Sequence, residues 1–116
     1  MNLAGKRVLL VEDEVIIGFA LDDMISDEGA QTTLVASRAD AERALAETDY
    51  DLAIIDVNLN GDLSYPLADV LTEKGCPFIF ATGYGNVTHP DRFAKVPTVG
   101  KPYNLATIMQ ATTGVL

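Results

Sequence analysis

Short apolar runs alternate with amphipathic segments along the whole chain, and this alternation restricts the possible fold more than any other feature. Four runs occupy residues 8–11, 52–55, 78–81 and 97–99, and a fifth, less apolar run occupies residues 31–36. Short continuous apolar runs are typical of strands that are covered on both faces, as in parallel sheets. Each run is therefore predicted to be a strand.

Segments with helical spacing lie between the runs. Residues 14–28 repeat apolar side chains at helical intervals, and three more helices are predicted, one capped by Ser37, one ended by Gly75 and one around residues 105–112. Residues 83–91 contain two glycines and a proline, so any helix there is predicted to be short or mobile.

Strand and helix alternate five times, which predicts an α/β fold of the (βα)5 class, a doubly wound parallel sheet with right-handed crossovers. The pattern uses all 116 residues, so a single domain over 1–116 is expected, with no second domain left over. In a sheet of order 2-1-3-4-5, the first and third strands are neighbours.

Composition excludes several classes of function. A net charge of −9, with eight scattered Lys and Arg residues, argues against nucleic-acid binding, which requires a basic surface. Cys76 is the single cysteine, so no internal disulfide or cysteine-based zinc site is expected. No apolar stretch is long enough to span a bilayer and the N-terminus does not resemble a signal peptide. We expect a soluble cytoplasmic protein with no membrane partner.

Polar side chains follow the predicted strands at the edge where ligands of open α/β sheets bind. Glu12 and Asp13 follow the first strand, Asp56 ends the third, Thr82 follows the fourth and Lys101 follows the fifth. Any one of these alone is more typical of a helix cap, a turn or a solvated surface. The presence of all five at one edge of the sheet predicts a functional site.

The charges limit what this site can be. Two carboxylates about 5 Å apart repel by about 3 kcal/mol at an effective dielectric constant of about 20. Three are tolerable only if they are protonated, paired or bound to a cation. Lys101 can offset part of the charge, and Mg2+, which prefers carboxylate oxygens together with phosphate, can offset more. An aspartate in such a site can itself accept a phosphoryl group.

The set Glu12-Asp13, Asp56, Thr82 and Lys101-Pro102, in this order and on these strand ends, resembles a bacterial two-component response-regulator receiver domain. The likeness covers the whole chain. The stretch PFIFATGYG is similar to a stand-alone subgroup with a Phe-Ala-Thr-Gly signature at the fourth strand. The resemblance implies a flavodoxin-like fold with strand order 2-1-3-4-5.

The resemblance also implies a role for each position. Asp56 corresponds to the phosphoacceptor, and Thr82 and Lys101 correspond to the switch hydroxyl and the phosphoryl-binding lysine. Mg2+ is expected at Asp13, Asp56 and the backbone carbonyl of Asn58, with Glu12 acting through water. The bond between Lys101 and Pro102 is expected to be cis.

From this resemblance, we expect a single-domain response regulator without an output domain. It would receive its phosphoryl group from a histidine kinase or a histidine phosphotransfer protein. It would then signal through a downstream protein partner, or act as a relay, shuttle or phosphate sink. It is not expected to be an enzyme beyond its own Mg2+-dependent phosphorylation and dephosphorylation.

Two other functions remain open. One is a phosphorylation-independent interaction module that keeps the fold. The other is a small Mg2+-dependent phosphohydrolase with Asp56 as nucleophile, which is disfavoured because Asn58 stands where the second acid is expected.

The chain departs from the family pattern at two positions. Thr98 stands three residues before Lys101, where the family usually has Tyr or Phe, and Asn60 stands where many members have proline. We therefore hypothesise that residues 83–91 form the moving part, with Tyr84 as the aromatic beside Thr82. His89, the sole histidine, is expected to be exposed to solvent.

Overall fold

The computed structural model describes residues 3–83 and 89–116. Its five-stranded sheet is parallel throughout and has the order β2-β1-β3-β6-β7, which confirms the predicted 2-1-3-4-5 arrangement. The strands of this sheet are β1 (Arg7–Val11), β2 (Gln31–Val35), β3 (Leu52–Asp56), β6 (Phe78–Thr82) and β7 (Thr98–Gly100). All five lie within one or two residues of the predicted runs.

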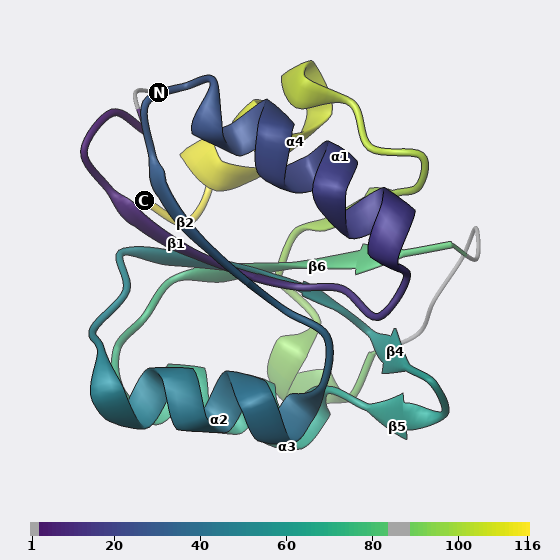
Figure 1. The fold of residues 1–116 in the computed structure, drawn as a ribbon. Helices are drawn as coiled ribbons and strands as arrows, with labels where there is room; N and C mark the ends of the chain where they lie inside the picture. The colour runs from purple at the N-terminus through teal and green to yellow at the C-terminus, as the bar shows by residue number, and fades with distance from the viewer. Residues whose placement is uncertain (1–2, 84–88) are drawn as a thin grey trace.

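Four helices cover the two faces of this sheet. Figure 1 shows α1 (Val15–Ser26) and α4 (Leu105–Thr113) above the sheet, and α2 (Arg38–Glu47) and α3 (Tyr65–Glu73) below it. Between β6 and β7, the described part of the chain contains the 3-10 turn η1 (Asp91–Phe93). No helix in the described ranges is long and apolar enough to cross a membrane.

The core explains why β1, β3 and β6 are mostly apolar. In β1, Val8 and Leu10 pack with the α1 and α4 side, whereas Leu9 and Val11 pack with the α2 and α3 side. Every residue of β3 and β6 is buried. Side chains alternate between the two faces of a strand, so a strand covered on both faces has no polar position to alternate with.

Local signals set the element ends. The Ser37 hydroxyl accepts a hydrogen bond from the backbone N–H of Asp40 at 3.1 Å, as predicted for the cap of α2. Gly75, with φ of 69°, follows α3 in the left-handed conformation that glycine adopts without strain. The bond between Lys101 and Pro102 is cis, as expected.

A hairpin that the sequence analysis did not predict follows β3. Strands β4 (Asn58–Leu59) and β5 (Asp62–Leu63) pair antiparallel across Asn60 and Gly61, whose φ values are 55° and 87°. Positive φ at both central residues is the requirement of a type I′ turn, and Asn-Gly is its preferred sequence. The turn also explains Asn60, because proline, with φ fixed near about −65°, cannot adopt this conformation.

The hypothesis of a moving part at residues 83–91 falls largely on residues 84–88, which include Tyr84 and lie outside the described residues. His89, by contrast, is described, and the expectation that it is exposed to solvent is wrong. Its side chain is half-buried, and both ring nitrogens have hydrogen-bond partners.

Candidate functional site

Strand register brings the predicted site residues to one edge of the sheet. Val11 at the end of β1 pairs with Ile55 in β3, so Glu12 and Asp13 emerge beside Asp56. On the other side, Asp56 pairs with Ala81 in β6. Thr82 pairs with Gly100 in β7, and Lys101 follows Gly100. The carboxyl ends of four neighbouring strands therefore deliver the five side chains to one place.

The three carboxylates form a tight cluster. One carboxylate oxygen from each of Glu12, Asp13 and Asp56 lies within 4.8 Å of the others. Glu12 is 2 % exposed and Asp56 is 5 % exposed, whereas Asp13 is half-buried. Burial weakens the screening of charge by water, so repulsion within this cluster is strong unless a cation balances it.

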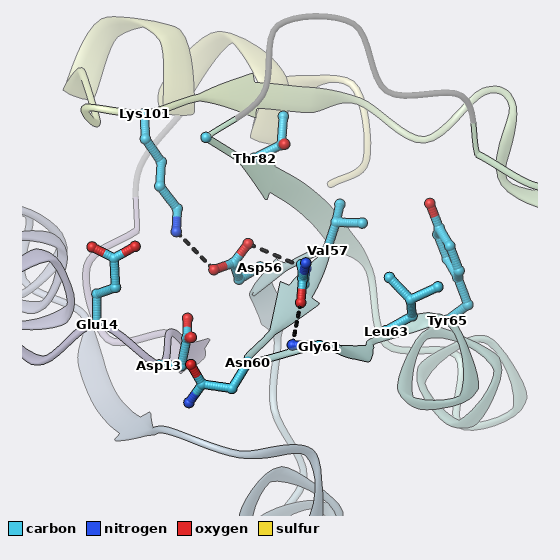
Figure 2. A pocket seen from close by; sticks show the side chains of 12 residues that line it. Asp13, Glu14, Asp56, Val57, Asn60, Gly61, Leu63, Tyr65, Thr82 and Lys101 are labelled. Carbon is cyan, nitrogen blue, oxygen red and sulfur yellow. Dashed lines mark hydrogen bonds and ion pairs between the residues drawn. The ribbon is translucent and has the colours of Figure 1, made fainter.

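Lys101 supplies one such cation. Its ammonium lies 2.7 Å from Oδ2 of Asp56 and 2.7 Å from Oε1 of Glu12. Figure 2 shows the Lys101 side chain reaching down toward Asp56, with Asp13 below the lysine's ammonium. One ammonium cannot balance three ionised carboxylates, so the fully ionised cluster retains an excess of negative charge.

The surroundings shift the protonation of this group. The pKa of Asp56 is raised to about 7, mainly because burial disfavours the charged form and in part because of the charge of Glu12, while the hydrogen bond and charge of Lys101 oppose the rise. Burial lowers the pKa of Lys101, but its hydrogen bonds to Asp56 and Glu12 and their charges outweigh burial, so the net pKa is raised. Lys101 therefore stays protonated, while Asp56 is held near the point of ionisation at neutral pH.

Glu12 is fixed by three donors. Its Oε1 accepts from Lys101 and from the Tyr103 hydroxyl at 3.1 Å, and its Oε2 accepts from the backbone N–H of Glu14 at 3.1 Å. Burial, together with the charge of Glu12, raises the pKa of Tyr103, so this hydroxyl remains a donor. The sequence analysis did not single out Tyr103, because no sequence signal pointed to this bond between residues 91 positions apart.

Asp13 differs from its two neighbours. Within residues 3–83 and 89–116, its carboxylate has no hydrogen bond and no ion pair. It faces the same cavity as Asp56 and Lys101. Uncompensated carboxylate oxygens fit a hard divalent cation such as Mg2+, which takes oxygen ligands and retains several waters. The residues present thus suit a magnesium site made of Asp13 and Asp56, with Glu12 held behind them by Lys101 and Tyr103.

The β4–β5 hairpin forms the floor of the site. The backbone N–H of Asn58 lies 3.4 Å from Oδ1 of Asp56, and the side-chain oxygen of Asn58 accepts from the backbone N–H of Gly61 at 2.6 Å. The Asn58 side chain is therefore engaged in the turn. Its backbone carbonyl as a metal ligand stays a prediction.

A cavity of about 790 Å3 opens over these residues. Asp13, Asp56, Thr82 and Lys101 line one part of it, and Leu63 and Tyr65 line another. Figure 2 shows Asp13 and Glu14 on one side of Asp56 and Leu63 and Tyr65 on the opposite side. The cavity is thus acidic at one end and apolar, with a phenol, at the other.

Residues 8–113 match the family described as the response regulator receiver domain. This chain belongs to that family. Receiver domains bind Mg2+ at an acidic pocket, and this receiver domain carries the acidic cluster of Glu12, Asp13 and Asp56 at the expected edge of the sheet.

Relatives of known sequence support the same assignment. The chain is 34 % identical over 84 residues to the transcriptional regulatory protein PcoR of Escherichia coli, covering 71 % of this chain and 37 % of PcoR. It is 31 % identical over 111 residues to the transcriptional regulatory protein TcrA of Mycobacterium tuberculosis, covering 90 % of this chain and 43 % of TcrA. The receiver domain therefore spans less than half the length of these relatives.

Solved structures of similar size agree over nearly the whole chain. SdrG from Sphingomonas melonis Fr1 has a TM-score of 0.83 and 31 % identity, covering 98 % of each chain. A BeF3-activated conformation of SdrG, from Pseudomonas melonis Fr1, has a TM-score of 0.80 and 32 % identity, covering 96 % of each chain. The receiver domain of PhyR from Erythrobacter litoralis has a TM-score of 0.76 and 26 % identity, covering 95 % of this chain and 88 % of that one.

Proposed function

We propose that this receiver domain accepts a phosphoryl group on Asp56, in a Mg2+-dependent reaction, from a phosphohistidine of a histidine kinase or histidine phosphotransfer protein. The observation that carries the proposal is the arrangement around Asp56. A buried carboxylate forms an ion pair with a lysine and lies beside the carboxylate of Asp13, which has no ion pair among the described residues.

The chain's own residues would divide the work as follows. In the transfer, a bond forms between an Asp56 carboxylate oxygen and phosphorus while the bond from phosphorus to the donor's imidazole nitrogen breaks, and that nitrogen keeps the electron pair. Mg2+, when bound by Asp13, Asp56 and the Asn58 carbonyl, supplies positive charge to the phosphoryl oxygens. Lys101 and the Thr82 hydroxyl would hold the remaining oxygens.

We further propose that the chemistry ends at Asp56, so that the chain catalyses only its own phosphorylation and dephosphorylation. The phosphorylated form would pass its signal to a downstream protein, or return the group as a relay or phosphate sink. A dianion held by Lys101 and Thr82 changes the balance of charge at four strand ends. Such a change can shift an existing conformational equilibrium.

Helix α1 offers a surface on which the phosphodonor could dock. Val15, Ile16 and Phe19 are 61 %, 83 % and 58 % exposed. Val15 and Ile16 follow directly after Glu14, which lines the cavity over Asp56, and Phe19 lies about one helical turn further along α1. Neighbouring exposed apolar side chains commonly mark a protein contact, and these lie where a donor histidine would have to approach. We therefore propose these three residues as part of the phosphodonor interface.

Replacing Ile16 or Phe19 with alanine is expected to slow phosphotransfer from the protein donor about tenfold, because interface anchors of this kind commonly contribute more than about 1 kcal/mol. Phosphorylation by acetyl phosphate should be unchanged, since it needs no docking. Leu116→Ala is the matched control. This exposed residue is at the C-terminus, which lies at the opposite edge of the molecule from the β4–β5 hairpin that lines the cavity (Figure 1). Equal loss with both donors would contradict the assignment.

Beryllofluoride, which mimics a phosphoryl group, separates the proposal from a phosphorylation-independent interaction module. The structural relative SdrG has been solved in a BeF3-activated conformation. We expect this chain to bind beryllofluoride only with Mg2+ and only with Asp56 intact, with fluorine and amide NMR as the readout. Absence of any Mg2+-dependent signal would favour the interaction module, whose support is Thr98 in place of the usual aromatic residue.

A further inference from the structure

A hydrogen-bonded chain of three side chains runs beside the phosphoacceptor pocket. The Tyr65 hydroxyl lies 2.9 Å from Nδ1 of His89, and Nε2 of His89 lies 2.7 Å from Oγ1 of Thr98. Both nitrogens of the imidazole are therefore engaged with hydroxyl groups. These residues come from three separate segments: the start of α3, the stretch before η1, and β7.

Aromatic packing fixes the imidazole between its two hydroxyl partners. The ring of His89 lies over Phe80, with centroids 4.5 Å apart, and meets the ring of Tyr65 edge-on at 5.7 Å. Tyr65 in turn stacks on Phe93 of η1 at 5.9 Å. Burial lowers the pKa of His89 and raises the pKa of Tyr65. The hydrogen-bonded series therefore joins neutral groups, each of which can donate or accept a hydrogen bond.

The two end residues of this hydrogen-bonded series, Tyr65 and Thr98, are both connected to the candidate site. Tyr65 lines the same cavity as Asp56 and Thr82. Thr98 begins β7, pairs with Phe80 in β6, and lies three residues before Lys101. The strand that delivers the lysine to Asp56 is therefore tied, through one imidazole, to the wall of the pocket.

The small side chain of Thr98 makes this link possible. A threonine presents a hydroxyl at the edge of the sheet. The aromatic residue that usually occupies this position in receiver domains would present a ring instead. His89 supplies the ring instead, and Thr98 supplies its polar partner. Residues 65, 89 and 98 are thus complementary to each other in this chain.

We propose that Tyr65, His89 and Thr98 act as one positioning unit, which couples the wall of the pocket to β7 and pre-aligns both for a phosphoryl group on Asp56. The inference rests on the proposed phosphoacceptor function. None of the three is a catalytic residue. Tyr65 and Thr98 act together only through the imidazole of His89.

A double-mutant cycle measures this coupling directly. Tyr65→Phe and Thr98→Val each remove one hydroxyl and keep the shape of the side chain. Each is expected to weaken Mg2+-dependent beryllofluoride binding about two- to tenfold, the range that one hydrogen bond commonly contributes. Either change breaks the same series of hydrogen bonds. The beryllofluoride affinity of the double variant should therefore be no lower than that of the single variant with the lower affinity. Additive losses, or no loss in either single variant, would overturn the proposal.

His89→Phe keeps a ring against Phe80 but removes both nitrogens. In this background, Tyr65→Phe and Thr98→Val should no longer change beryllofluoride affinity, and persisting effects would overturn the role of the imidazole. Tyr50→Phe and Thr113→Val are matched controls. They remove the same hydroxyls from a tyrosine at the core and an exposed threonine in α4, and should leave affinity unchanged.

Nitrogen NMR of the His89 ring in the wild-type protein needs no variant to fold. We expect the ring nitrogen shifts to change when beryllofluoride binds at Asp56. Binding at Asp56 with unchanged His89 nitrogens would overturn the coupling alone. Absence of beryllofluoride binding would overturn the phosphoacceptor proposal, and the coupling with it.

Discussion

Replacing Lys101 with methionine is expected to lower the free energy of unfolding by about 2–3 kcal/mol in metal-free buffer. The ammonium makes 2.7 Å contacts with both Asp56 and Glu12, and these two carboxylates are buried. Removing one partner of a buried ion pair commonly costs about 3–5 kcal/mol. The cost is expected to be smaller here, because the pocket is open to a cavity and Asp56 can take up a proton instead.

The same substitution should remove most of the response to a phosphoryl group, because the ammonium that links Asp56 to β7 is lost. Urea denaturation with and without Mg2+ measures the first effect, and amide NMR with beryllofluoride measures the second. Mg2+ should restore part of the stability, since it replaces the missing positive charge. Lys95→Met, at an exposed position, should change stability by less than about 0.5 kcal/mol. A full beryllofluoride response in Lys101→Met would remove this lysine from the mechanism.

Replacing Asp56 with asparagine should have the opposite effect on stability. The substitution is expected to raise the free energy of unfolding by about 1–2 kcal/mol at pH 8 without metal. Asparagine keeps the shape of the side chain but removes one of three clustered carboxylates. Lys101 retains Glu12 as a partner. The repulsion relieved is therefore larger than the attraction lost.

The pH dependence of this difference follows from the raised pKa. Asp56 has a pKa of about 7 in the folded protein and 3.8 as its ordinary value. Between these values the folded state holds a proton that the unfolded state has released, so the wild type loses stability as pH rises from about 4 to about 7. One pKa unit corresponds to about 1.4 kcal/mol, so the shift from 3.8 to about 7 sets an upper limit of about 4 kcal/mol on this loss. Water in the open pocket screens the charges and is expected to reduce the loss to about 1–2 kcal/mol, the value given above.

The gain in free energy of unfolding of Asp56→Asn over the wild type should therefore be small at pH 4.5 and reach its plateau above pH 7. Urea denaturation at several pH values measures it. Asp69→Asn is a suitable control, because Asp69 pairs with Arg92 at the exposed surface and should show no such rise. An Asp56→Asn variant that is less stable than wild type at pH 8 would contradict this reading of the cluster.

The sequence was sufficient for the sheet because burial on both faces leaves a strong local signature. Continuous apolar runs such as residues 52–55 identified strands, and the side chains that follow them identified the site edge. The serine cap of α2 was also visible, because capping depends on a residue type at a fixed spacing. These features are local, so the sequence carries them directly.

The features that were not predicted from the sequence depend on weaker or longer-range signals. The β4–β5 hairpin has only two residues in each strand, too few for a periodic pattern, although the Asn60-Gly61 pair was an available indication. The bonds of Tyr103 to Glu12, and of His89 to Tyr65 and Thr98, join residues that are far apart in the sequence or lie in an irregular segment. A polar residue in a loop gives no indication of its partner until the fold brings the two together.

The central claim, that Asp56 accepts a phosphoryl group with the help of Mg2+, is tested most directly by intact mass after incubation with acetyl phosphate. Asp56→Asn and metal-free samples serve as controls. The account predicts the gain of one phosphoryl group in the wild-type protein with Mg2+, and no gain in either control. Modification of Asp56→Asn to the same extent, or modification of the wild type that is equally fast without Mg2+, would contradict it.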